Sequence, residues 1–260
     1  MKPVALVTGG ARRLGEVFVR ALAEQGFHVV IHANASVDRG AALANALAAK
    51  GMSAECAGFD LTDWRGVPDF MDGLISRLGP MRLMVNSASI FEYDQPGEID
   101  PEQFSRTIDL NLKAPVLLAQ AFARPHRGKG RDGGVIVNML DQKLWNLNPD
   151  FFSYTVAKQA LHGATQLLAR SFAPDVRVCG LAPGITLPSG DQTEEEFERA
   201  HTHNPMQGGS TPEDLVRALQ FILDTPSFTG STLLVDGGQH FDSRNRDVMF
   251  DPAVRKDAKP

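Results

Sequence analysis

The feature that most constrains this chain is a strand, turn, helix and strand pattern at its start. The apolar run PVALVT at residues 3–8 ends in the glycine-rich segment GGARRLG, and apolar residues then recur at helical spacing until Gly26. A second strand-like run, FHVVIH, follows at residues 27–32. Two strands joined by one helix within about thirty residues predict a βαβ unit, whose strands are parallel and buried.

The same alternation continues along the chain. Further strand-like runs stand at residues 53–59, 81–86, 134–139, 176–181 and 231–236. Helical patterns separate them, at about 39–50, 64–78 and 101–124, on the segment from Tyr154 to Phe172, within 189–203 and from Thr211. This alternation predicts an α/β fold, a single Rossmann-type doubly wound parallel sheet of about seven strands with helices on both faces.

No internal repeat or low-complexity linker divides the chain, so residues 1–242 are expected to form one nucleotide-binding domain. The remaining residues, 243–260, are charged and aperiodic. Two arrangements of this tail stay open: it is loose, or it docks on a neighbouring subunit.

Composition excludes several classes of protein. Of 260 residues, 43% are apolar and 22% charged, as in ordinary soluble globular proteins, and the net charge of −5 offers no attraction to nucleic acid or an anionic membrane. Two cysteines without CxxC spacing argue against a disulfide framework or a thiolate metal site. No apolar run approaches about 18 residues. His201-x-His203 has no evident third metal ligand. We expect a cytoplasmic protein that holds no metal and spans no membrane.

The glycine-rich turn is a candidate phosphate-binding site. Gly9, Gly10 and Gly15 permit a tight turn and close backbone approach, and the helix that follows offers free amides to an anion. Arg12 and Arg13 oppose the helix dipole there, a cost that a bound anion would offset. The spacing is not GxGxxG, so a plain strand-to-helix connection is the alternative.

The end of the second strand bears on the choice of cofactor. An acid usually stands there in chains that prefer NAD, because it binds the ribose 2′-hydroxyl. Here the segment reads HANAS at residues 32–36, with no carboxylate before Asp38, which favours NADPH. Two roles are expected for Asp60, which follows the third strand: it meets the adenine, or it caps the next turn through Thr62 or Asp63. The candidate cofactor-binding residues are Gly9, Arg12, Arg13, Leu14, Gly15, His32, Asn34, Ser36, Asp60, Leu61, Asn86, Ser87, Ala88, Lys158, Pro183 and Gly184.

A second candidate site lies between Asp141 and Lys158. Tyr154 and Lys158 are four residues apart on an expected helix and therefore share one face. An ammonium beside a phenol stabilises the phenolate, so Lys158 is expected to lower the pKa of Tyr154. Asp141 follows an apolar strand and can reach the same place. The alternatives are an incidental Tyr-x-x-x-Lys on a solvated helix face and an Asp141 that caps the local turn.

Taken together, these motifs resemble the short-chain dehydrogenase/reductase family over about residues 3–240. The TGGARRLG turn, the NSAS turn after the fourth strand, Tyr154-x-x-x-Lys158 and Pro183-Gly184 occur in the family's order. The resemblance implies that Asn111 completes the catalytic set by opening its helix and holding a water near Lys158. The family's usual serine is here Asp141, and the middle glycine of its turn is here Arg13.

Both departures resemble the pteridine reductase branch, which includes bacterial dihydromonapterin and dihydrofolate reductases. That branch also has the Ser-x-Phe that is here Ser89-Ile90-Phe91. The resemblance implies NADPH-dependent reduction of a C=N bond in a dihydropterin, with a proton delivered by Tyr154 and Asp141. It further implies that Arg13, Ser89 and Phe91 position the substrate, together with Asp141 and Tyr154. Phe91 as a buried loop anchor is the alternative.

The same resemblance suggests a homotetramer packed through the Tyr154 helix, and segment 187–208 is expected to fold over the substrate. Two other functions stay open. One is a carbonyl reductase acting on a ketone, a sugar or another secondary alcohol with the same cofactor. The other is a non-catalytic dinucleotide-binding protein.

Overall fold

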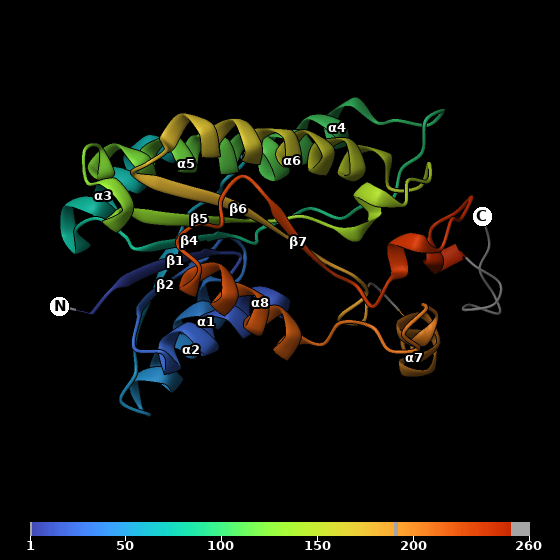
Figure 1. Cartoon of the computed structure of the whole chain (residues 1–260), viewed down its shortest axis with the longest axis horizontal. Helices are drawn as coiled ribbons and strands as arrows, with labels where there is room; N and C mark the ends of the chain where they lie inside the picture. Colours follow the sequence, from blue (N-terminus) through green and yellow to red (C-terminus); the bar gives the residue numbers. More distant parts are fainter. Residues whose placement is uncertain (1, 190–191, 251–260) are drawn as a thin grey trace.

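The computed structural model describes residues 2–189 and 192–250, and its centre is a seven-stranded parallel sheet (Figure 1). The strand order is β3-β2-β1-β4-β5-β6-β7, and every neighbouring pair is parallel. The predicted doubly wound sheet is therefore confirmed. The strands are β1 (Val4–Thr8), β2 (His28–Ala33), β3 (Ser53–Gly58), β4 (Leu83–Asn86), β5 (Gly134–Met139), β6 (Val176–Pro183) and β7 (Thr232–Val235).

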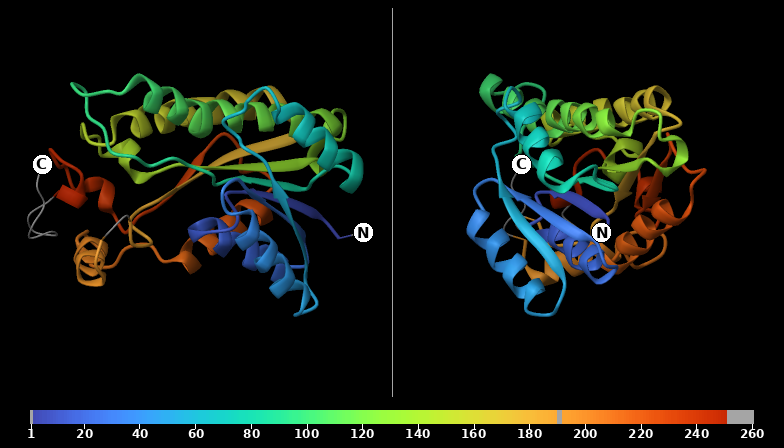
Figure 2. Two further views of the ribbon diagram at one scale, coloured as in Figure 1. Left: turned by 180° about the vertical axis from the view of Figure 1, so that it is seen from behind. Right: turned by 90° about the vertical axis from the view of Figure 1, so that its left-hand side faces the viewer.

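Helices cover both faces of the sheet, as Figure 2 shows from two further sides. One layer contains α1 (Arg13–Glu24), α2 (Val37–Ala48) and α8 (Pro212–Asp224). The other contains α3 (Val67–Leu78), α4 (Pro101–Ile108), α5 (Ala114–Ala123) and α6 (Phe152–Phe172). The helix expected from residue 64 begins at Val67, because Pro68 suits the first turn of a helix, where no hydrogen bond from its nitrogen is needed.

Alternation along each strand divides the core between the two layers. In β1, Ala5 and Val7 pack into the cluster that contains α1, α2 and α8, whereas Val4 and Leu6 pack into the cluster under α3, α5 and α6. Successive side chains of a strand point to opposite faces, and in a parallel sheet both faces are covered. For this reason the central strands are largely apolar on both faces, whereas the edge strand β3 is only partly buried and contains Ser53 and Glu55.

The helical region expected at 101–124 contains one irregularity. Between α4 and α5 the backbone forms a π-helical turn, Asp109–Lys113, centred on the buried Asn111. The expected local opening of the helix at Asn111 is therefore present. The Asn111 side chain accepts a hydrogen bond from Ile90 N and donates one to Ile90 O, both at 2.8 Å. It thereby joins the opened helix to the segment after β4.

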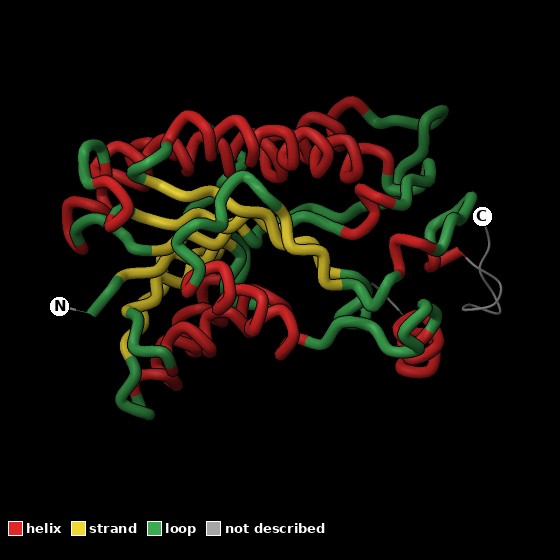
Figure 3. The backbone as a smooth tube through the Cα atoms, viewed as in Figure 1, coloured by secondary structure: helices red, strands yellow, loops and turns green. Residues whose placement is uncertain are grey.

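Several segments gather beyond the carboxyl ends of the strands (Figure 3). They include α7 (Glu194–Thr202), which begins with a capping box between Thr193 and Glu196, and the chain that follows β7. Residues 243–250 contact their own chain there, through Arg246 and Asp247, and residues 251–260 lie outside the described part. Within the described part, no helix is both long and apolar enough to cross a membrane.

Candidate active site

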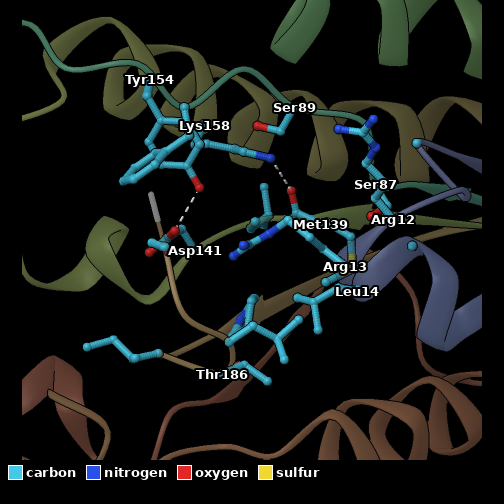
Figure 4. Close-up of a pocket in the computed structure, with 18 of the residues that line it drawn as sticks. Arg12, Arg13, Leu14, Ser87, Ser89, Met139, Asp141, Tyr154, Lys158 and Thr186 are labelled. Atoms are coloured by element: carbon cyan, nitrogen blue, oxygen red, sulfur yellow. Dashed lines mark hydrogen bonds between the residues drawn. The ribbon is translucent and has the colours of Figure 1, made fainter. Parts of the chain in front are cut away.

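A cavity of about 610 Å³ opens at the carboxyl ends of the strands. Its wall is built from the turns after β1, β2, β4, β5 and β6, from α6 and from the chain after β7 (Figure 4). Most of the expected site residues line it. They are Gly9, Arg12, Arg13, Leu14, Gly15, Asn34, Ser36, Ser87, Ala88, Ser89, Phe91, Asp141, Tyr154, Lys158, Pro183 and Gly184.

The turn between β1 and α1 leaves no room for side chains at two positions. Gly9 has a φ of 63°, and a Cβ there would lie 2.9 Å from the Cα of Ala88. A Cβ on Gly15 would lie 2.2 Å from the carbonyl oxygen of Gly9. Helix α1 then begins with no side-chain cap on its first amides. Backbone close to a cavity, together with free amides at a helix N-terminus, makes a place where an anion binds favourably.

The two arginines of this turn have different surroundings. Both are exposed and line the cavity. Arg13 has a φ of 51°, which is uncommon for a residue with a side chain, and its Nη1 donates to Pro188 O at 2.6 Å. This bond joins the turn to the segment that leads into α7. Arg13 thus reaches across the cavity from the β1–α1 turn.

His32 lies beneath the turn and not in the cavity wall. Its side chain is 2% exposed, its Nδ1 accepts from Gly9 N at 3.2 Å, and its Nε2 lies 2.9 Å from Phe59 O. Burial lowers its pKa, so the ring is neutral at physiological pH. The sequence placed His32 among the cofactor-binding residues. The structure instead gives both ring nitrogens partners within the protein, which hold the turn.

Four further predicted site residues also lie outside the cavity wall. Leu61 is in the core, and Asn86 is buried and donates to Asn138 Oδ1 at 2.8 Å. The carboxylate of Asp60 accepts from the backbone and hydroxyl of Thr62, which is the capping role left open by the sequence. Asn111 hydrogen-bonds the backbone of Ile90, as described above. These side chains shape the turns around the cavity.

Tyr154, Asp141 and Lys158 meet at one end of the cavity, as Figure 4 shows. The Tyr154 hydroxyl donates to Asp141 Oδ2 at 2.7 Å. Lys158 Nζ donates to Met139 O at 2.6 Å and lies 5.6 Å from the centre of the Tyr154 ring. Helix α6 presents the phenol and the ammonium on one face, and the end of β5 presents the carboxylate.

The electrostatics of this group correct one expectation. Burial raises the pKa of Tyr154 well above its usual value, and the Asp141 carboxylate raises it further, so the predicted lowering by Lys158 is wrong. Burial lowers the pKa of Lys158 to about 8, with Asp141 opposing the change. Burial also raises the pKa of Asp141, against the hydrogen bonds it accepts from Lys143 N and Tyr154. In this arrangement Tyr154 is a proton donor.

Phe91 belongs to an aromatic cluster at the same end of the cavity. Its ring stacks on Phe151 with centroids 4.0 Å apart and meets Tyr154 edge-on at 4.7 Å. The side chain is nevertheless 42% exposed. Phe91 is therefore not a buried loop anchor, because one part of its ring packs and another remains open to the cavity. Ser89, two residues earlier, is exposed beside it.

Sequence reasoning missed a group of residues from two segments. Gln142 and Lys143 follow Asp141, whereas Asp247, Val248 and Met249 come from the tail, and all five line the cavity. The aperiodic tail carried no signal that would bring it to this place. The segment expected to fold over the site does reach the wall through Leu187, Ser189 and Gln192. Among the described residues, no group of three or more His, Cys, Asp or Glu side chains is arranged to hold a metal ion.

Among known proteins, the chain is similar to reductases of dihydromonapterin and dihydrofolate. Dihydromonapterin reductase of Escherichia coli K12 is 25% identical over 235 residues, covering 90% of this chain and 95% of that protein. FolM alternative dihydrofolate reductase 1 of Brucella canis, solved with NADP, is 40% identical with a TM-score of 0.88, covering 94% and 96% of the two chains. The Brucella suis protein, also with NADP, is 41% identical with a TM-score of 0.86 and the same coverage.

A family model described as short chain dehydrogenase matches residues 3–199. The match spans the sheet from β1 to β6, the glycine turn, and the helix that carries Tyr154 and Lys158. The chain belongs to the short chain dehydrogenase family.

Proposed function

We propose that this protein is an NADPH-dependent reductase that acts on a C=N bond of a dihydropterin or a related cyclic substrate. The observation that carries the proposal is the 2.7 Å hydrogen bond from Tyr154 to a carboxylate, Asp141, at the end of the cavity. Solved relatives at 40% and 41% identity carry NADP and are described as alternative dihydrofolate reductases. A relative at 25% identity is a dihydromonapterin reductase.

The cavity suits a dinucleotide cofactor. A Cβ on Gly9 or Gly15 would fill the turn where phosphates approach, and the uncapped start of α1 supplies amides to them. Asn34 and Ser36 stand at the end of β2, where a carboxylate would repel a 2′-phosphate, and Arg12 lies nearby on the cavity wall. When bound, NADPH supplies the hydride.

The residues of the chain supply the proton. Tyr154 holds its proton at the hydroxyl because its raised pKa disfavours the phenolate. Return of a proton to the phenol after it protonates a substrate nitrogen requires Asp141 in its protonated form, which burial favours by raising the pKa of Asp141. Lys158 Nζ, 5.6 Å from the centre of the Tyr154 ring, places a positive charge near a transient phenolate, while burial and Asp141 keep the net pKa of Tyr154 raised.

A carboxylate also suits the substrate better than a serine would. Asp141 can accept hydrogen bonds from the amino groups of a pterin when ionised and donate one when protonated. The open part of the Phe91 ring offers a flat apolar surface for a heteroaromatic ring, and stacked rings contribute about 0.5–1.5 kcal/mol beyond their buried area. Arg13 and Ser89 also line the cavity and add polar groups to its wall.

The test is NADPH oxidation by the purified protein with dihydrobiopterin, dihydromonapterin and dihydrofolate, beside a panel of simple ketones. We expect turnover of at least one pterin. We expect Tyr154→Phe to lower kcat by about 10²-fold or more while leaving NADPH affinity unchanged. Reduction of ketones with no oxidation of NADPH by any of the pterins would contradict the proposal.

We propose in addition that residues 1–242 form one domain and that the protein is a cytoplasmic homotetramer packed through α6. The exposed side of α6 supports the assembly, because Leu167 is 72% exposed and a Cβ on Gly163 would meet no atom within 4 Å. A large exposed apolar residue beside a small one suits close approach of a second helix. Two free cysteines are consistent with a reducing compartment.

A further inference from the structure

The loop between Asp141 and Tyr154 buries two opposite charges. Lys143 is 3% exposed and Asp150 is 0% exposed. Charged groups are rarely buried to this extent unless they are paired, because removal from water is costly. Within the loop, Lys143 donates to Asn148 Oδ1, a neutral partner. The Lys143 ammonium therefore needs a counter-charge from elsewhere in the chain.

Residues 246–250, here called the tail segment, supply the partners for both charges. Asp247 Oδ2 lies 2.8 Å from Lys143 Nζ. Arg246 Nε lies 2.8 Å from Asp150 Oδ2, and the backbone N–H of Asp247 donates to the same oxygen at 2.7 Å. Asp150 also accepts from the Tyr93 hydroxyl at 3.3 Å. The conformation of the loop between Asp141 and Tyr154 thus depends on the tail segment.

The tail segment also supports the aromatic side of the cavity. The Phe250 ring lies 6.2 Å from Phe151, nearly parallel to it, and 5.0 Å from Tyr93. Phe151 is the ring on which Phe91 stacks, so Phe250 belongs to the same aromatic cluster as Phe91. Phe151 has a φ of 53° and a ψ of 50°, a left-handed conformation that persists in an aromatic residue only where the surroundings hold it.

Three residues of the tail segment face the cavity directly. Asp247, Val248 and Met249 line the same space as Asp141 and Tyr154. The residues that suit the cofactor phosphates belong to the β1–α1 turn and the end of β2, and none of the contacts described for the tail segment involves them. A change in the tail segment should therefore act on the substrate and spare the cofactor.

We propose that the tail segment is part of the substrate site, in which Asp247 is a positioning residue for the Asp141 loop and Met249 limits the size of the substrate. The inference rests on the proposed function, since it assigns the pterin to this end of the cavity. It makes the C-terminal chain of the same subunit a determinant of substrate selectivity.

The experiment compares three single variants of the full chain. Asp247→Asn keeps the shape of the side chain and removes the charge that faces Lys143. Met249→Trp fills the cavity without touching the ion pairs. Asp242→Asn is the matched control, because it neutralises a carboxylate of the same C-terminal region that pairs with Arg244 and lies off the cavity wall. The readouts are NADPH affinity, pterin affinity by fluorescence quenching, and hydrogen exchange of residues 142–153.

We expect Asp247→Asn to weaken pterin binding about tenfold or more and to speed exchange in 142–153, because it leaves Lys143 buried without a counter-charge. Met249→Trp should weaken binding of a pterin with a long side chain more than that of a short one, with exchange unchanged. NADPH affinity should stay within about twofold in all variants. The double variant Lys143→Met/Asp247→Leu should recover part of the pterin affinity, because it leaves no buried charge unpaired.

Pterin affinity and exchange in Asp247→Asn and Met249→Trp equal to those of Asp242→Asn would overturn the inference. Failure of the proposed function has a different signature. In that case the unmodified protein binds NADPH but no pterin, while the exchange of residues 142–153 still decides whether Asp247 holds the loop. Weaker NADPH binding in Asp247→Asn or Met249→Trp than in Asp242→Asn would also count against a role confined to the substrate.

Discussion

At the scale of single residues, Asp141 stands where the family usually has a serine, and this difference changes the acid–base behaviour of the neighbouring Tyr154. A hydroxyl at this position would leave the Tyr154 phenol free to respond to Lys158. Burial raises the pKa of Tyr154, and the Asp141 carboxylate, which accepts a hydrogen bond from the phenol at 2.7 Å, raises it further. The phenolate that would abstract a proton from an alcohol is therefore disfavoured, which agrees with a reductase.

The pH dependence of pterin reduction tests this reading of Asp141. Its pKa is raised by burial, so the carboxyl carries a proton at higher pH than an exposed aspartate and loses it as the pH rises through that raised pKa. We therefore expect kcat/KM for reduction to fall with rising pH, which gives the pH profile a descending limb on its high-pH side. In Asp141→Asn the limb should disappear, with kcat lower by about 10²-fold, because the side chain can no longer supply a proton. Initial rates measured from acid to alkaline pH give the profile.

An unchanged high-pH limb in Asp141→Asn would assign the titration to another group. Lys158, whose pKa is lowered to about 8, is the next candidate in the site. Deprotonation of Lys158 would remove positive charge beside the phenol, so the two groups affect the rate in the same direction. The comparison of Asp141→Asn with Lys158→Met separates them.

At the scale of elements, the glycine turn depends on a residue from the next strand. Gly9 N donates to His32 Nδ1, and His32 Nε2 bonds Phe59 O, so one imidazole joins β1, β2 and the end of β3. The ring is buried and its pKa is lowered by that burial. His32 does not line the cavity, so it contributes to the site by fixing the shape of the glycine turn.

We predict that His32→Leu destabilises the protein by about 1–3 kcal/mol, because it leaves the Gly9 N–H and the Phe59 carbonyl without their partner. NADPH affinity should fall as the turn loosens, while pterin affinity at the far end of the cavity changes less. Urea unfolding and fluorescence titration measure the two effects. Loss of NADPH affinity with full stability would instead indicate direct contact with the cofactor.

At the scale of the whole molecule, the exposed side of α6 is the surface on which assembly is proposed. Leu167 projects from it with 72% of its surface exposed. A charged residue at this position would oppose close packing of two helices, because burying an unpaired charge is costly.

If the proposed homotetramer forms through α6, Leu167→Lys should convert it to smaller species while each subunit keeps its fold. Light scattering coupled to size-exclusion chromatography measures the mass, and circular dichroism serves as the control for folding. Lys substitution at Phe221, 48% exposed on α8, tests whether the effect is specific to α6. A protein that is monomeric before any substitution would contradict the assembly.

The periodic parts of the sequence determined most of this structure. Seven apolar runs with helical patterns between them predicted the parallel sheet, because strands buried on both faces must be apolar throughout. Glycine spacing predicted the turn at Gly9 and Gly15, where the backbone leaves no space for a Cβ. Motif order brought Asp141, Tyr154 and Lys158 together, because the carboxyl ends of parallel strands share one edge.

Tertiary structure alone decided the rest. Burial raises the pKa of Tyr154, and the carboxylate 2.7 Å from the phenol raises it further; neither the burial nor this contact can be read from sequence distance. The His32 ring is buried beneath the glycine turn because the packing of three strands places its two hydrogen-bond partners there. The tail segment has no periodicity, yet its Arg246 and Asp247 pair with charges buried about a hundred residues earlier in the chain. Such long-range pairing is set by the folded surface that the tail meets, and no local pattern encodes it.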